Sequence, residues 1–146
     1  MADTDPFSTV EILAMTAIGE SESLGQKGMT QTICTVMNRV KANLVWMGGS
    51  DVRQVCLQKG QYDCWWPQSN NEDRERILDI AKNNPLYGPY VFALGLAQSA
   101  IAGTLADITN TAVSYGDNGE KPKVHPGSQP CLIDGMRVFF NLLAVA

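Results

Sequence analysis

The sequence is poor in histidine and in basic residues. His125 is its one histidine, and 11 Lys and Arg stand against 15 Asp and Glu, which gives a net charge of -4. Zinc hydrolases usually recruit two or more histidine ligands, and no His-Glu-x-x-His or paired Cys-x-x-Cys spacing occurs, so we expect no metal site and no cofactor. The negative charge offers little attraction to phosphate backbones, so nucleic acid is disfavoured as a partner.

Long hydrophobic runs are also missing. No apolar stretch reaches the roughly 18 residues of a membrane span, so we expect no membrane insertion. Residues 1–6 carry two acids and neither a basic segment nor a long apolar core, so we expect no secretory signal peptide. If the protein acts outside the cytosol, it needs another route of delivery.

The length and composition fit one domain. A chain of 146 residues, 45% hydrophobic and 18% charged, can bury one core but is short for two, so we expect a single domain over residues 1–146. With such a core the four cysteines are not needed as disulfide staples, and their redox state stays open. The oligomeric state is open as well.

Local signals predict several helices. Ser8 and Glu11 have the spacing of a capping box, which predicts a helix from about Thr9 to Glu20. Its apolar residues wrap almost all round, as in a helix at the centre of a domain, and Gly19 should end or loosen it. Further helices are expected over Met29–Leu44, Val52–Leu57, about 71–84 and Tyr90–Gly103.

The last third of the chain has a different texture. Glycines and prolines interrupt it repeatedly, and short strands are expected over Thr111–Tyr115 and Met136–Phe140. The fold class expected is therefore α+β, mainly α-helical, with a small antiparallel β-sheet.

Glu20 is the first candidate for chemistry. It lies at the C-terminal end of an apolar helix, where burial and the negative end of the helix dipole both disfavour an ionised carboxylate. Its pKa should therefore be raised, as a general acid working near neutral pH requires. The structural alternative is an exposed glutamate at a helix end.

The aromatic loop from Gln61 to Trp66 is the second candidate. Tyr62, Trp65 and Trp66 offer faces on which sugar rings could stack, and Gln61 and Asp63 could bond sugar hydroxyls. The alternative is that these rings close a small core.

A cysteine nucleophile is the third candidate. Cys34 or Cys64 with His125 would form the pair found in cysteine peptidases and amidases. However, Cys34 lies inside a periodic helix among apolar neighbours, which favours a core position. For Arg39 the pattern favours a structural role over carboxylate binding.

Several segments of the chain, taken in order, match the motif pattern of one known family. Gly19-Glu20 resembles that family's Gly-Glu-Ala element, with Gly28 at the distance of its later glycine. The other matching segments are Val36–Val40 for Val-Leu-Asn-Arg-Val, Val55–Trp65 for Val-x-x-Gln-x-x-Gln-Phe-Ser-x-Trp, Asp107–Tyr115 for Asp-Pro-Thr-x-Gly-Ala and following aromatics, and Ile133–Phe140 for Ile-Gly-x-His-x-Phe-Tyr. Together these segments resemble the SleB-type cell wall hydrolase family, a lysozyme-like group that cleaves peptidoglycan glycan strands. The resemblance covers roughly Val10 to Asn141.

The resemblance implies a lysozyme-like domain in which Glu20 is the catalytic acid. Gln61, Tyr62, Trp65 and Tyr115 would bind the glycan. The chain departs from the family pattern in three places: Leu24 stands where a second glutamate often occurs, the aromatic before Tyr115 is missing, and the closing histidine has no clear counterpart near Met136 and Arg137.

Because the chain has a single well-placed glutamate, our hypothesis is that the protein is a lytic transglycosylase. The alternatives are a hydrolytic muramidase whose second acid is Glu22, Asp63 or Asp107, a cysteine-dependent amidase or peptidase, and a silent glycan-binding or phage structural module. The expected partner is bacterial peptidoglycan. Made in the cytoplasm without a signal, such a domain is compatible with a phage lysis protein released by a holin, a virion-associated enzyme or an injected toxin.

Overall fold

The computed structural model describes residues 2–67, 72–117 and 128–142. Its helices are α1 (Thr9–Ser21), α2 (Gly25–Ala42), α3 (Val52–Leu57), α4 (Glu72–Asn83) and α5 (Gly88–Ile101), with short 3-10 turns η1 (Glu22–Leu24) and η2 (Val45–Met47). The strands are β1 (Ser114–Gly116), β2 (Ser128–Asp134) and β3 (Arg137–Leu142). The predicted class, mainly helical α+β with a small antiparallel sheet, is confirmed.

Helix α1 runs through the centre of the helical layer. The predicted capping box starts it, with Ser8 Oγ accepting from the Glu11 N–H and the Glu11 carboxylate accepting from the Ser8 N–H. Residues Ile12 to Ile18 are all buried, because α2, α3, α4 and α5 each pack against this helix. A helix enclosed in this way has no polar face, which explains its nearly continuous apolar sequence.

Gly19 does not end α1, so that part of the expectation was wrong. The helix continues through Ser21, and Gly19 serves instead as a point of close approach. A Cβ atom built on Gly19 would lie 2.5 Å from the Cβ of Cys64. Only glycine therefore lets the loop after α3 pack against the last turn of α1.

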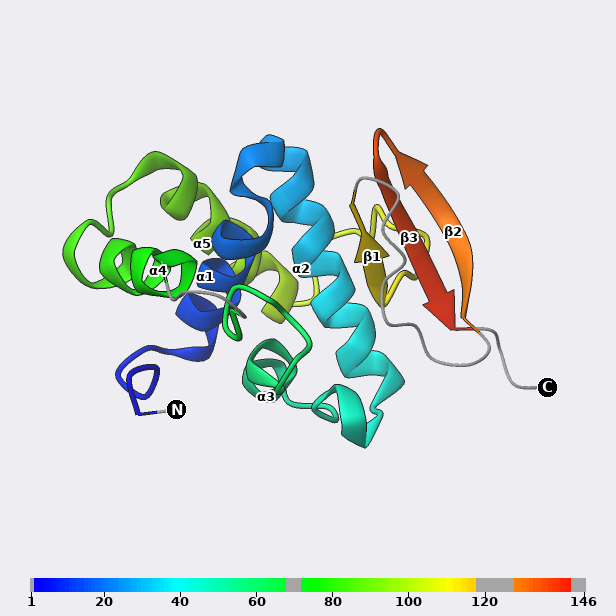
Figure 1. Cartoon of the computed structure of the whole chain (residues 1–146), viewed down its shortest axis with the longest axis horizontal. Coiled ribbons are helices and arrows are strands. Elements are labelled where there is room, and N and C mark those ends of the chain that lie inside the picture. The colour runs from blue at the N-terminus through cyan, green and yellow to red at the C-terminus, as the bar shows by residue number, and fades with distance from the viewer. Residues whose placement is uncertain (1, 68–71, 118–127, 143–146) are drawn as a thin grey trace.

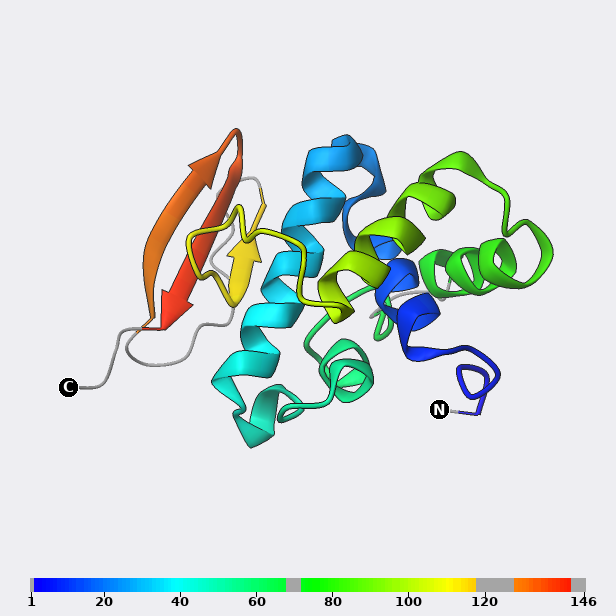
Figure 2. The same ribbon diagram turned by 180° about the vertical axis from the view of Figure 1, so that it is seen from behind.

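The sheet lies on one side of α2, and α1, α4 and α5 lie on the other, as both ribbon views show (Figures 1 and 2). Its strand order is β1-β3-β2, with both pairs antiparallel. Strand β2 was not predicted from the sequence, because Pro130 falls inside it. It is an edge strand with a register irregularity beside Pro130, and an edge or a bulge is where a sheet tolerates proline.

Candidate active site

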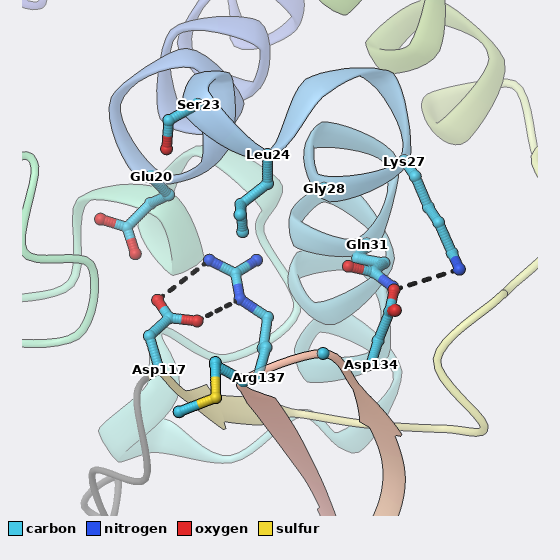
Figure 3. Close-up of a pocket in the computed structure, with 11 residues that line it drawn as sticks. Glu20, Ser23, Leu24, Lys27, Gly28, Gln31, Asp117, Asp134 and Arg137 are labelled. Atoms are coloured by element: carbon cyan, nitrogen blue, oxygen red, sulfur yellow. Dashed lines mark hydrogen bonds and ion pairs between the residues drawn. The ribbon is translucent and has the colours of Figure 1, made fainter.

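A pocket of about 520 Å³ opens where the end of α1 and the start of α2 meet one end of the sheet (Figure 3). Its size lies within the range of sites for small molecules or short oligomers. The residues that line it are Glu20, Ser23, Leu24, Lys27, Gly28, Gln31, Asp117, Asp134, Gly135, Met136 and Arg137.

Glu20 reaches this pocket from the last turn of α1. Its Oε1 accepts a hydrogen bond from the Tyr115 hydroxyl at 2.8 Å, and its Oε2 accepts one from the backbone N–H of Cys64 at 3.1 Å. Burial raises the pKa of Glu20, and these two hydrogen bonds oppose the rise without cancelling it. The expectation of a raised pKa is thus confirmed, with burial as its largest cause, and the carboxyl keeps its proton to a higher pH than an exposed glutamate.

Arg137 is the central residue that sequence reasoning missed. Its Nε and Nη2 donate to the two carboxylate oxygens of Asp117 at 2.6 and 3.1 Å, and Nη1 donates to Ser21 Oγ at 3.0 Å. The guanidinium carbon lies 4.0 Å from the centroid of the Tyr115 ring. The sequence held one signal, because Arg137 and Phe139 fall on the same face of the expected strand by period two. The structure shows that both are buried.

The other end of the pocket carries exposed charges. Lys27 Nζ lies 3.1 Å from a carboxylate oxygen of Asp134, which also accepts a hydrogen bond from Gln31 Nε2 at 2.7 Å. The hydrogen bond from Gln31, followed by that from Lys27, holds the pKa of Asp134 below its usual range. This end of the pocket therefore presents an ionised carboxylate beside an ammonium group.

The predicted glycan-binding residues fall into two groups. Tyr115 contacts Glu20 directly. Tyr62 and Trp65 are 1% and 0% exposed, with the Tyr62 hydroxyl bonded to Thr35 and the Trp65 indole N–H donating to Thr16, so neither offers a ring face to a sugar. Both side chains are therefore core residues, as in the alternative interpretation of the aromatic loop.

Gln61 and Arg39 contact each other and residues that lead into the site. Gln61 Oε1 accepts from Arg39 Nη1 at 3.2 Å, and the Arg39 guanidinium carbon lies 4.6 Å from the Tyr62 ring centroid. Arg39 Nε donates to the backbone oxygen of Val113, which leads into β1. The structural role favoured for Arg39 is confirmed.

The acids considered as partners for Glu20 are engaged elsewhere or exposed. Glu22 forms an ion pair with Arg76 at 2.7 Å, and the Asp63 side chain is exposed. Asp107 accepts hydrogen bonds from Thr109 and Thr111 within its own loop. Partial burial raises the pKa of Asp107, but these hydrogen bonds outweigh it and leave the pKa below its usual range.

The cysteines do not have the environment of a nucleophile. All four are free, and Cys34 and Cys64 are buried. Burial raises the pKa of both thiols, which keeps them protonated and unreactive near neutral pH. His125, their proposed base, lies outside the described residues.

The described residues contain neither a cluster of metal ligands nor a membrane-spanning helix. Within residues 2–67, 72–117 and 128–142, no group of three or more His, Cys, Asp or Glu side chains is placed to hold a metal ion. No helix in that part of the chain combines the length and apolar character needed to cross a bilayer.

The sequence model of the Cell Wall Hydrolase family matches residues 23–139, most of the chain, and the match starts three residues after Glu20. Comparison with curated proteins and with solved structures gave no match. The family implies peptidoglycan as the substrate and the bacterial cell wall as the place of action. The matched range includes α2, the loop of Asp107, strands β1 and β2 and the start of β3, so the chain belongs to the Cell Wall Hydrolase family.

Proposed function

We propose that this protein cleaves peptidoglycan glycan strands between N-acetylmuramic acid and N-acetylglucosamine, with Glu20 as the catalytic acid. The observation that carries the proposal is the setting of Glu20, which lines the pocket with its pKa raised by burial while Tyr115 and the Cys64 N–H hold its two oxygens. A protonated, fixed carboxyl in a cleft is what general acid catalysis needs.

A lytic transglycosylase mechanism uses this single carboxyl twice. Glu20 donates its proton to the glycosidic oxygen, and the bond to the muramyl anomeric carbon breaks through an oxocarbenium-like state. The ionised Glu20 then removes the proton of the muramyl 6-hydroxyl, whose oxygen bonds to the anomeric carbon and gives a 1,6-anhydro end. Between the two steps Tyr115 and the Cys64 N–H stabilise the anion.

A hydrolytic muramidase is the second candidate, and Asp117 favours it. Asp117 lines the same pocket as Glu20, although it was not among the acids considered from the sequence. Its carboxylate is 43% exposed and is held by Arg137, so it is available to direct a water molecule toward the anomeric carbon. In that mechanism the product carries a reducing end.

The test is mass spectrometry of the fragments released from purified peptidoglycan by the wild type and by Glu20→Gln. We expect anhydromuramyl ends from the wild type and no fragments from the variant. Reducing ends that disappear in Asp117→Asn would establish the muramidase instead. Full cleavage by Glu20→Gln would overturn the assignment of Glu20, and freed stem peptides would indicate an amidase or peptidase.

A stability measurement would check that Glu20→Gln folds and would test the raised pKa of Glu20 independently. Because folding raises the pKa of Glu20, the unfolded chain binds this proton less tightly, and stability falls as pH rises above about 4.3, the unfolded value. The glutamine variant lacks this penalty. We expect its melting temperature to exceed that of the wild type near neutral pH, with the difference vanishing below about pH 4. Equal melting curves at both pH values would contradict the raised pKa.

A further inference from the structure

A continuous chain of hydrogen bonds connects Arg137 with Glu20. Arg137 Nη1 lies 3.0 Å from Ser21 Oγ, which lies 2.6 Å from Thr32 Oγ1. Thr32 Oγ1 lies 3.3 Å from the Tyr115 hydroxyl, which lies 2.8 Å from Glu20 Oε1. Three hydroxyl groups from three different elements, α1, α2 and β1, therefore separate the guanidinium from the proposed acid.

The direction of this chain is fixed by its two ends. When ionised, Glu20 can only accept, so the single proton of the Tyr115 hydroxyl is committed to it. The Tyr115 oxygen then accepts from Thr32, and the Thr32 oxygen accepts from Ser21. Ser21 in turn accepts from Arg137, which can only donate. Every hydroxyl proton in the chain therefore points toward Glu20.

Arg137 also fixes the tyrosine ring itself. Its side chain is 3% exposed, and its guanidinium carbon lies 4.0 Å from the Tyr115 ring centroid. A cation over the ring of a phenol favours the phenolate form and so makes the O–H a stronger hydrogen-bond donor. Figure 3 shows the guanidinium beside Asp117, with both Asp117 oxygens facing it and Glu20 on the same side of the arginine as Asp117.

We propose that Arg137 is a positioning residue for Glu20: through Ser21, Thr32 and Tyr115 it keeps a hydroxyl donor on the carboxyl during cleavage, and Asp117 balances its charge. The proposal rests on the proposed function, in which Glu20 alternates between acid and anion. The ionised carboxylate gains most from a fully directed donor chain, since hydrogen bonds to a charged acceptor are stronger and reinforce one another.

Other charged and titratable groups near Glu20 must be kept constant in any test. Asp63 raises the pKa of Glu20 by charge repulsion, and the Cys64 thiol adjoins it. Among the described residues, further charged or titratable groups on the surrounding elements are Tyr62 in the loop after α3, the Lys27–Asp134 pair at the far end of the pocket, and the Glu22–Arg76 pair between η1 and α4. None of these is changed in the variants below.

The two halves of the Arg137–Asp117 pair should act on Glu20 in opposite directions. Arg137→Met removes the cation and the orienting donor, which disfavours the anion, so the pKa of Glu20 should rise. Asp117→Asn leaves the cation unbalanced, which favours the anion, so the pKa should fall. An ion pair that only holds the fold together would not produce opposite shifts.

The measurement is a 13C NMR titration of the Glu20 side-chain carboxyl in glutamate-labelled protein, with the signal assigned by its loss in Glu20→Gln. Relative to the wild type we expect the pKa of Glu20 to rise in Tyr115→Phe, Arg137→Met and Thr32→Val, in decreasing order. It should fall in Asp117→Asn. The effect of Arg137→Met should shrink in the Tyr115→Phe background, because the arginine acts through the tyrosine. The pH above which the cleavage rate falls should shift in the same direction as the pKa of Glu20 in each variant.

Thr30→Val is the matched control for Thr32→Val. It makes the same change on the same helix, but within the described residues the Thr30 hydroxyl donates to the Gln26 backbone oxygen of that helix and not toward Glu20. The titration of Glu20 should therefore not move. If Arg137→Met does not fold, Thr32→Val and Tyr115→Phe still test the chain. Unchanged midpoints in these two variants, or shifts of the same sign in Arg137→Met and Asp117→Asn, would overturn the proposal. The titration needs no turnover, so it can succeed even if Glu20→Gln cleaves and the proposed function fails.

Discussion

The helical layer and the sheet are held in place by different forces. Around α1 most contacts are apolar, and Ile12 to Ile18 are almost completely shielded from water. The sheet and the loop before it are attached to α1 and α2 largely by directional polar contacts: Gln31 to Asp134, Asn38 to the Ala112 oxygen, Arg39 to the Val113 oxygen, and Arg137 to Ser21.

This difference matters for the site. Glu20 belongs to the apolar layer, where close packing fixes its depth and raises its pKa. Tyr115, Arg137 and Asp117 belong to the sheet side, where hydrogen bonds fix their direction. The acid is thus placed by one kind of force and its donors by another, and each can be weakened separately.

A substitution that disrupts the apolar packing of α1 should have the largest effect on stability. In Gly19→Ala the new methyl group would meet Cys64 Cβ at 2.5 Å and its Sγ at 2.8 Å, so the loop that donates the Cys64 N–H to Glu20 must move. We expect a loss of about 3 kcal/mol in the free energy of unfolding, measured in urea, together with a large loss of cleavage.

Gly95→Ala is the control for this change. Gly95 is also inside a helix, α5, but a Cβ there would meet nothing within 4 Å. Alanine should therefore stabilise the protein by about 0.5–1 kcal/mol through its helix propensity. If both variants were stabilised, close approach at Gly19 would not constrain the fold.

Breaking the polar side should have a smaller effect on stability. Asn38 Nδ2 donates to the Ala112 oxygen at 2.9 Å and reaches Asp107 and Thr109 at 3.2 and 3.3 Å. Asn38→Ala leaves a buried carbonyl oxygen without its donor, which should cost about 2 kcal/mol. The urea midpoint should fall accordingly, while Asn83→Ala, which loses only an exposed bond to Asp79, should change stability by under about 0.5 kcal/mol.

The comparison also explains what the sequence could predict. The helices were predicted because their signals are local: the capping box at Ser8 and Glu11 and the apolar periodicity of α2 need no knowledge of distant residues. Glu20 was found for the same reason, since its position at the end of an apolar helix already implies a raised pKa.

The sheet side depends on partners far apart in the chain. Arg137 meets Ser21 across 116 positions, and Gln31 meets Asp134 across 103, so no window of sequence contains both partners. Trp65 shows the opposite error: its aromatic character suggested sugar stacking, but its indole N–H finds a buried partner in Thr16, and only the fold reveals that.

The smallest expected change in stability concerns Thr111, in the loop that leads from Asp107 into β1. Thr111 stands where the SleB-type pattern has glycine, and it adopts φ 67°, which a β-branched residue avoids. Thr111→Gly should relieve that strain, offset in part by the greater freedom of glycine in the unfolded chain and by loss of the hydroxyl contact with Asn141, for a net gain of about 1 kcal/mol. Thr104→Gly is the control, because Thr104 is also an exposed threonine but lacks a positive φ, and it should lower the urea midpoint instead. A loss of stability in Thr111→Gly would mean that the hydroxyl bonds of Thr111 outweigh the strain, and that polar contacts hold even the backbone of this loop against its preferred conformation.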